Sequence, residues 1–193
     1  MGLSSLRNAT MPFFAPITLT TLRLVLRPIR DEDASALFAV WSDAEAMRYF
    51  SFPPMHCLEQ ATERIARASK RSAAGEDLIC VLCLRTTGDV IGDCALSRAD
   101  APNRRAEIGF CLQRQHWGHG YMREATSALV DHAFTALNLH RIEADIDPRN
   151  LASARLLKRL GFVREGLLRE RWRVGDEVSD SELYGLLERD RRA

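Results

Sequence analysis

A pair of glycines between a strand-like run and a long amphipathic stretch constrains the fold most strongly. Gly118 and Gly120 follow the apolar run 106–112 and precede helical periodicity that starts at Met122. A strand that turns on glycines into a helix leaves several backbone N–H groups unpaired, with the positive end of the helix dipole behind them. The turn therefore predicts a phosphate or pyrophosphate site, although glycines also occur at such turns for backbone geometry alone.

Two common nucleotide-binding patterns do not fit this turn. Tyr121 and Met122 follow Gly120, whereas a nucleoside triphosphate loop ends in Gly-Lys-Ser/Thr. Gln115 stands where a dinucleotide fingerprint has its first glycine, and no early strand–turn–helix unit with a ribose-binding acid follows. The sequence thus argues against nucleoside triphosphate hydrolysis and against a Rossmann fold.

Hydrophobic periodicity predicts one mixed α/β domain over residues 19–190, after a loose tail at 1–18. Helices are expected after Asp31, which would cap the first, and then at 58–75, 122–137 and 150–161. Strands are expected at 22–28, 78–84, 90–96, 106–112, 141–146, 162–168 and 178–187. Residues 98–104 read as a polar loop, and 49–55 as a loop or broken helix. This order predicts a mixed sheet with helices on both faces.

The charge balance limits the partners. With 27 basic and 26 acidic residues the net charge is +1, so no strong field would attract nucleic acid or an anionic membrane. No apolar run reaches the ~18 residues of a membrane span. The first 18 residues lack a basic region followed by a sustained apolar core, so no signal peptide is expected. A cytoplasmic location is predicted.

The five cysteines have apolar neighbours and are predicted to be reduced core thiols. Cys80 and Cys83 have the spacing of a metal or redox motif, but they lie in a predicted strand, where residues three apart point to opposite faces. No second ligand pair follows, and the histidines at 116, 119, 132 and 140 have no partner at metal spacing. No metal site is predicted.

Several spaced motifs resemble one enzyme superfamily. Gln115-x-x-Gly118-x-Gly120 resembles the pyrophosphate motif of the GNAT acetyltransferases. The segments 106–110 and Asn150-x-x-Ser153 are similar to the branch that includes the RimJ/RimL-type ribosomal-protein N-terminal acetyltransferases. Further similarities to that branch lie at 21–28, Asp33-Ala34, 160–162, Glu165-Gly166, and Asp180 with Tyr184. The resemblance covers roughly residues 20–188.

The resemblance implies a GNAT-like fold in which the fourth and fifth strands of a mixed, mostly antiparallel sheet splay apart around acetyl-CoA. Backbone groups of Phe110, Cys111 and Leu112 would pair with the pantetheine amides, as an added strand would. The remaining cofactor contacts that it implies are Gln115, Gly118, His119, Gly120, Tyr121 and Met122, with Asn150 and Ser153 from the late helix.

Attack on a thioester needs a neutral amine, and a carboxylate can remove the proton. Glu107, on the strand beside the splay, is the candidate base, although a salt-bridged strand residue would look the same. Many GNAT enzymes protonate the departing thiolate with a tyrosine at the position of Leu157. Ser153 is the substitute that the branch pattern suggests, and a serine bonded to its own helix is the alternative.

The acceptor side is expected to be walled by aromatic residues, with a carboxylate for the cationic amine. The candidates are Trp41, Phe50, Phe52, Trp172 and Asp180. Any of these aromatics would also suit a core. Trp172 stands where some ribosomal-protein acetyltransferases of this branch carry a glutamate, so their scheme does not transfer whole.

The resemblance therefore implies an acetyl-CoA-dependent N-acetyltransferase that acts by direct attack in a ternary complex, without a metal. The acceptor stays open among a protein N-terminus, a small amine or polyamine, and an aminoglycoside. Because Leu157 replaces the usual acid, a non-catalytic acyl-CoA-binding module is the alternative. An edge strand near the C-terminus would allow a homodimer.

Overall fold

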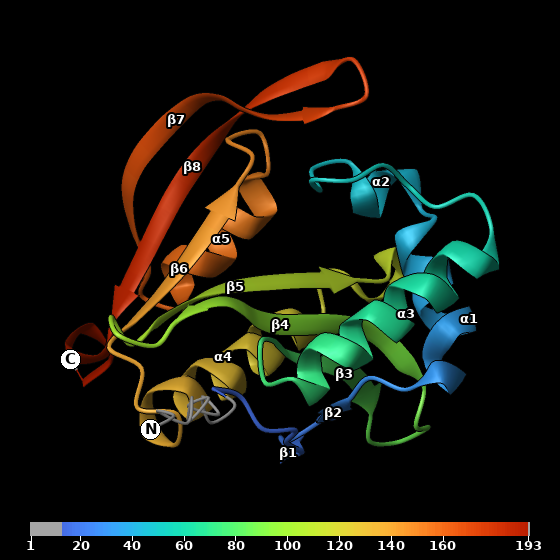
Figure 1. The fold of residues 1–193 in the computed structure, drawn as a ribbon, viewed down its shortest axis with the longest axis horizontal. Helices are drawn as coiled ribbons and strands as arrows, with labels where there is room; N and C mark the ends of the chain where they lie inside the picture. The colour runs from blue at the N-terminus through green and yellow to red at the C-terminus, as the bar shows by residue number, and fades with distance from the viewer. Residues whose placement is uncertain (1–12, 193) are drawn as a thin grey trace, which may run out of the picture.

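The computed structural model describes residues 13–192 and is built around an eight-stranded sheet of order β1-β2-β3-β4-β5-β6-β8-β7 (Figure 1). Neighbouring strands are antiparallel except β5 and β6, which are parallel. The strands are β1 (Leu19–Thr20), β2 (Leu24–Pro28), β3 (Leu78–Leu84), β4 (Val90–Asp100), β5 (Arg105–Leu112), β6 (Arg141–Ile146), β7 (Val163–Val174) and β8 (Glu177–Leu187). The predicted mixed, mostly antiparallel sheet is confirmed.

Helices cover both faces of the sheet, as predicted. They are α1 (Ala34–Trp41), α2 (Ala44–Met47), α3 (Leu58–Ala73), α4 (Tyr121–Thr135) and α5 (Leu151–Arg159), with short 3-10 turns at Asp31–Asp33, Arg114–His116 and Glu188–Arg192. Apolar side chains of α4 and α5 pack in one core cluster and those of α1 and α3 in another. Apolar residues that recur every 3.6 positions share one face of a helix, and those that recur every second position share one face of a strand. These apolar faces pack against each other between the helices and the sheet.

The strand β3 contributes to both cores. Cys80 belongs to the cluster under α4, and Cys83 to the cluster under α1 and α3, so the two thiols lie on opposite faces. Cys94 and Cys111 are buried as well. The prediction of core thiols is wrong for Cys57, which is exposed at the start of α3, where a helix terminus rather than apolar packing surrounds it.

The sheet forks between β5 and β6. Their parallel register runs from Arg105 opposite Arg141 to Glu107 opposite Glu143 and then stops. Figure 1 shows β6, β8 and β7 turning away from β5 beyond this point. The splay predicted for the fourth and fifth strands is therefore present, and Glu107 is the last paired residue at its apex.

Three local expectations differ from the structure. Asp31 does not cap the first helix, because it begins the 3-10 turn before α1, and the side chain of Asp33 binds the Arg30 N–H and Arg27 instead of capping α1. The predicted loop 98–104 begins inside β4, which continues to Asp100 through a register shift. The strand β7 continues to Val174 rather than 168, again through a register shift. Irregular pairing interrupts the alternation of apolar and polar residues along a strand. Polar segments can therefore belong to β4 and β7, although their sequence does not look strand-like.

Of the predicted tail 1–18, residues 1–12 lie outside the described part. Phe14 is only 1% exposed, and its N–H donates to the Gly75 carbonyl at 3.1 Å. Packing against the sheet thus reaches at least five residues before the predicted domain boundary at 19. The assignment of one domain stays a prediction.

Candidate active site

The glycine turn has the geometry of an anion receptor. Gly118 and Gly120 have φ of +79° and +77°, a conformation that favours glycine, and Gly120 precedes α4 without a side-chain cap. Among residues 13–192, no hydrogen-bond acceptor is found for the backbone N–H groups from Gly118 to Arg123, and the first helical bond here runs from Glu124 N–H to the Gly120 carbonyl. Because residues 118–120 are exposed, this row of donors faces solvent at the positive end of α4.

An ion pair from β2 fixes the turn. Arg23 binds Glu124 through its Nε at 2.6 Å, and its Nη1 donates to the His119 carbonyl at 2.9 Å. The same guanidinium lies 4.5 Å from the centre of the Tyr121 ring. Burial raises the pKa of Glu124, but hydrogen bonds from Thr21 and Arg23 outweigh it and lower that pKa overall. The turn is therefore held by a charged network, beside the packing of Tyr121 and Met122 on the core.

The β5 edge beyond the fork supplies a second set of main-chain groups. From Ile108 to Leu112 the strand pairs with β4 on one side and has no registered partner in β6 on the other. The Trp117 indole N–H donates to the Leu112 carbonyl at 2.8 Å and ties the turn to the end of this edge. Phe110, Cys111 and Leu112 thus lie on an edge that an extended ligand could complete.

The Cys111 thiol is buried against Met47, 4.0 Å between the sulfur atoms. Burial raises its pKa well above the ordinary value. The reactive thiolate form is suppressed, so Cys111 has no feature of a nucleophile.

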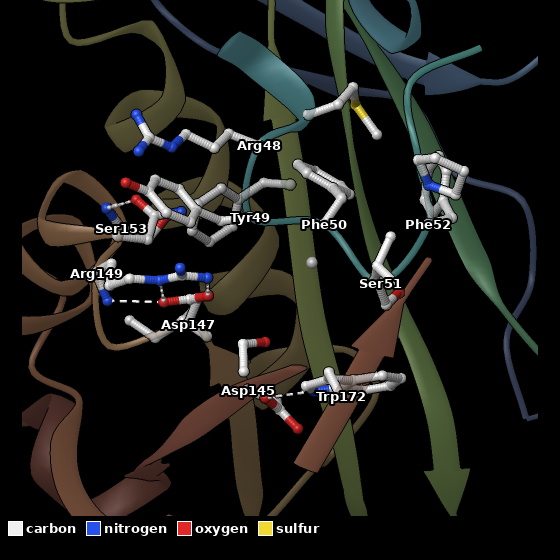
Figure 2. Close-up of a pocket in the computed structure, with 18 of the residues that line it drawn as sticks. Arg48, Tyr49, Phe50, Ser51, Phe52, Asp145, Asp147, Arg149, Ser153 and Trp172 are labelled. Carbon is white, nitrogen blue, oxygen red and sulfur yellow. Dashed lines mark hydrogen bonds and ion pairs between the residues drawn. The ribbon is translucent and has the colours of Figure 1, made fainter. Parts of the chain in front are cut away.

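A cavity of about 420 Å³ opens at the fork, a volume typical of small-molecule sites. It brings together most of the residues predicted for catalysis and for the acceptor, with two of the predicted cofactor contacts. The first group is Glu107, Ser153, Phe50, Phe52 and Trp172, and the cofactor contacts are Phe110 and Asn150. Figure 2 shows Tyr49, Phe50 and Phe52, from the segment after α2, across the cavity from Asp145 and Trp172. The proline pair at 53–54 also lines this wall, so the predicted loop after α2 forms one side of the cavity.

Glu107 is a partly buried carboxylate with one ionic partner. Arg98 Nη1 donates to its Oε2 at 2.8 Å, and the Glu107 side chain is 25% exposed. Burial raises the pKa of Glu107, the Arg98 charge lowers it, and the nearby carboxylates Asp145 and Glu143 raise it further. A carboxylate with a raised pKa in a cavity is a suitable general base, and the salt bridge foreseen as its alternative is also present.

The start of α5 presents Asn150 and Ser153 to the same cavity. Asn150 Oδ1 accepts from the Ser153 N–H at 3.0 Å and caps the helix, as predicted. No hydrogen bond of the Ser153 hydroxyl to the described residues is found, whereas Thr126 and Thr135 bond back to their own helix. Leu157 is fully buried in the core. Ser153 is thus the hydroxyl that α5 offers to the cavity, while the position of the usual tyrosine has none.

Two predicted acceptor residues lie elsewhere. Trp41 is 3% exposed in the core under α1, and its indole N–H donates to Asp93 at 3.2 Å. Asp180 accepts from the Glu170 N–H at 2.8 Å and fixes the irregular pairing of β7 and β8. Neither lines the cavity. The packing of α1 on the sheet decides the position of Trp41, and the irregular pairing of β7 with β8 decides that of Asp180.

The cavity is also lined by Arg98, Asp145, Asp147 and Arg149, which sequence patterns did not single out. Asp147 and Arg149 pair at 2.6 Å, and Arg149 also binds Glu177 at 2.7 Å (Figure 2). Asp145 accepts hydrogen bonds from Ser181 and, at 3.3 Å, from the Trp172 indole. The alternating positions in β6 were a usable signal for Asp145, but nothing in the sequence marked Arg98.

Residues 23–163, most of the chain, match the family described as Acetyltransferase (GNAT) domain. The chain belongs to the GNAT acetyltransferase family. The GNAT chain is 40% identical over 173 residues to the uncharacterized N-acetyltransferase p20 of Bacillus licheniformis, covering 90% of this chain and 97% of that protein. It is 31% identical over 96 residues, 50% of this chain and 54% of the relative, to the ribosomal-protein-serine acetyltransferase of Escherichia coli (strain K12).

A solved structure supports the same assignment. Mycobacterium smegmatis RimJ in complex with CoA-disulfide matches this GNAT chain with a TM-score of 0.79 and 27% identity, over 92% of this chain and 91% of RimJ. The predicted N-acetyltransferase enzyme of the GNAT family, with RimJ/RimL-type relatives, is therefore confirmed, and the family uses acetyl-CoA. Within residues 13–192 none of the helices has the length and apolar character needed to cross a membrane.

Proposed function

We propose that this GNAT chain transfers the acetyl group of acetyl-CoA to a primary amine by direct attack within a ternary complex. The proposal rests on three features found together in the described residues. They are the N–H groups of Gly118 to Arg123 without acceptors, the edge Ile108–Leu112 without a partner strand in β6, and a cavity lined by Glu107 and Ser153. The first two suit a diphosphate and an extended amide chain, and the third supplies the acid–base groups.

The turn 118–122 is proposed to hold the diphosphate, with the exposed residues Gln115 and His119 beside it. Asn150 and Ser153, which line the cavity, are proposed to contact acetyl-CoA from the start of α5. Two observations support this fit. The φ values of Gly118 and Gly120 favour glycine, which has no side chain to cover the N–H groups of the turn, and α4 has no side-chain cap that would occupy them. When bound there, acetyl-CoA supplies the activated acetyl group.

Glu107 is proposed to take the proton of the acceptor amine, directly or through water. The backbone N–H near Leu112 is proposed to stabilise the negative charge that develops on the thioester oxygen. Ser153 is proposed to give a proton to the departing sulfur and to take one back from solvent water, which a hydroxyl without a partner among the described residues allows. The buried, high-pKa thiol of Cys111 argues against an acetylated-cysteine route.

The acceptor is proposed to be an amine with a single positive charge, either a protein N-terminus or a small-molecule amine. Phe50, Phe52 and Trp172 would wall it. The cavity carboxylates Asp147 and Glu177 are already neutralised by Arg149, and Glu107 by Arg98. Without a surplus of unpaired acids, the cavity offers little to a polyamine or an aminoglycoside, which carry several charges.

A second candidate is an acyl-CoA-binding module without catalysis, which the buried Leu157 at the usual tyrosine position favours. One experiment separates the two. Free CoA thiol is measured while acetyl-CoA and a panel of peptides with free N-termini and small amines are presented, with an amine-free blank for hydrolysis. Amine-dependent thiol release supports the enzyme. Tight acetyl-CoA binding without any release above the blank would identify the module.

A further inference from the structure

Arg98 lies at the junction of two cavities. A second cavity of about 340 Å³ lies beside the first, and both are lined by Arg98, Glu107 and Asp145. The second cavity is lined by charged groups of β5 to β8, among them Arg105, Glu143, Arg141, Glu165 and Arg171. An acceptor that reaches Glu107 from either cavity therefore meets Arg98.

The backbone of Arg98 is unusual. Its φ of +51° lies in the left-handed region, within the register shift between Ser97 and Asp100. A residue with a side chain is strained in this conformation, which Arg104, Asn138 and Glu170 also adopt. The strain falls on the one residue of β4 whose side chain binds Glu107. Strained residues cluster at functional sites.

The contact between Arg98 and Glu107 is easily exchanged. Among the described residues, Arg98 donates one hydrogen bond to Glu107 and binds no other carboxylate, and its side chain is 52% exposed. Its guanidinium also lies 5.8 Å from the centre of the Trp172 ring. By contrast, Arg105 and Arg141 each bind two carboxylates. An exposed single pair has little net stability, so another cation can replace it.

The Glu107 carboxylate needs a counter-ion because two other carboxylates lie near it. Asp145 and Glu143 of β6 are the nearby carboxylates, and Arg98 of β4 is the cation that opposes them. The other charged groups of the second cavity are Arg105 of β5, Arg141 of β6, and Glu165 and Arg171 of β7, with the Tyr184 hydroxyl of β8. An amine acceptor arrives as an ammonium ion and offers Glu107 the same charge as Arg98 does.

We propose that Arg98 is a positioning residue that holds the Glu107 carboxylate toward the cavity and is displaced from it by the ammonium group of the acceptor. This rests on the proposed role of Glu107 as base. One cation replaces another on the carboxylate, so no net charge is left uncompensated. The displaced guanidinium remains beside Trp172, where a cation–π contact holds it at the cavity wall.

The first test needs no activity. The carboxyl carbon of Glu107 is followed by NMR during a pH titration, assigned by its loss in Glu107→Gln. In Arg98→Met the pKa of Glu107 rises, because Asp145 and Glu143 are no longer opposed, and Arg98→Lys returns it toward the wild-type value. Arg171→Met is the matched control, because Arg171 lines the second cavity, is 47% exposed, and within the described part of the chain has a single carboxylate partner, Asp145 at 3.9 Å. An unchanged titration in Arg98→Met overturns the inference.

The second test uses turnover with the best amine of the panel. Since the base must be ionised and held toward the cavity, Arg98→Met lowers kcat/KM at pH 6 by about fivefold, and this loss shrinks as the pH rises to 8 because Glu107 ionises again. At pH 8 its acceptor KM falls, because no guanidinium competes with the ammonium ion. A raised acceptor KM at pH 8 contradicts displacement. If the wild type releases no thiol with any amine, the proposed function fails, and the NMR titration still decides whether Arg98 controls Glu107.

Discussion

Two carboxylates at the fork differ in how firmly they are held. Asp145 accepts hydrogen bonds from Ser181 and Trp172 and is 7% exposed, so it belongs to the wall of the cavity. Glu107 is held by one exposed arginine, and its other oxygen has no partner among residues 13–192. At the residue scale, the less constrained carboxylate is the one available for proton transfer.

Replacing Glu107 by glutamine is expected to lower kcat/KM by about 100-fold at pH 7, because the amide cannot accept the proton of the amine. Acetyl-CoA affinity, measured by calorimetry, should change little. Glu143→Gln is the control, because Glu143 lies opposite Glu107 on β6 and is bound by Arg105 and Arg141. Equal rates for Glu107→Gln and the wild type would remove Glu107 as the base.

Replacing Ser153 by alanine is expected to lower kcat by roughly 10- to 100-fold while acetyl-CoA still binds, since the departing sulfur loses its proton donor. Single-turnover thiol release measures this step. Ser179→Ala, in the same cavity but on β8, should retain the wild-type rate. If both variants behave alike, Ser153 has no special part in the reaction.

Two elements, the glycine turn and the fork between β5 and β6, form the proposed acetyl-CoA site. Both could be predicted from sequence, the turn because glycines follow an apolar strand and the fork because the motifs resemble a known family. The positions of Arg98 and Asp180 could not be predicted from sequence. Arg98 reaches Glu107 through an irregular β4, and Asp180 is taken up by the irregular pairing of β7 with β8. Irregular pairing breaks the alternation on which a strand prediction depends.

The turn makes a prediction with a close control. Gly120→Ala and Gly88→Ala change glycines with φ of +77° and +81°, so each should lose roughly 1 to 2 kcal/mol of unfolding free energy. Only Gly120→Ala should weaken acetyl-CoA binding, by about tenfold, because Gly88 lies in the turn between β3 and β4. Calorimetry and denaturant unfolding measure the two effects. Equal acetyl-CoA affinities for the two variants would contradict a role for the turn.

For the whole molecule, the fold class and the enzyme family were accessible from sequence, while the packing beneath the cavity was not. Trp41 illustrates this, because its aromatic ring suited a pocket as well as a core. The structure turns it inward to Asp93, beside Arg64, whose guanidinium lies 4.2 Å from the centre of the Phe52 ring. The cavity wall is thus supported by a buried charged layer that joins α1, α3 and β4.

This layer predicts a pH dependence of stability. Burial raises the pKa of Asp93 from 3.8 to about 6, against the lowering effects of Arg64 and the Trp41 N–H. Because the folded state holds this proton more tightly than the unfolded chain, the contribution of Asp93 to stability is greatest below pH 3.8 and is lost as pH rises through about 6. The unfolding free energy of the wild type relative to Asp93→Asn should therefore fall between pH 4 and pH 7. A constant difference in denaturant unfolding would contradict it.

The central claim is that main-chain donors of the turn and the free edge of β5 together bind acetyl-CoA. Calorimetric titration tests it most directly, with acetyl-CoA compared to S-acetylpantetheine, which lacks the diphosphate. We expect one acetyl-CoA site per chain with a Kd in the range of about 1 μM to 1 mM and at least tenfold weaker binding of S-acetylpantetheine. No heat from acetyl-CoA, or equal affinity for both compounds, would contradict it.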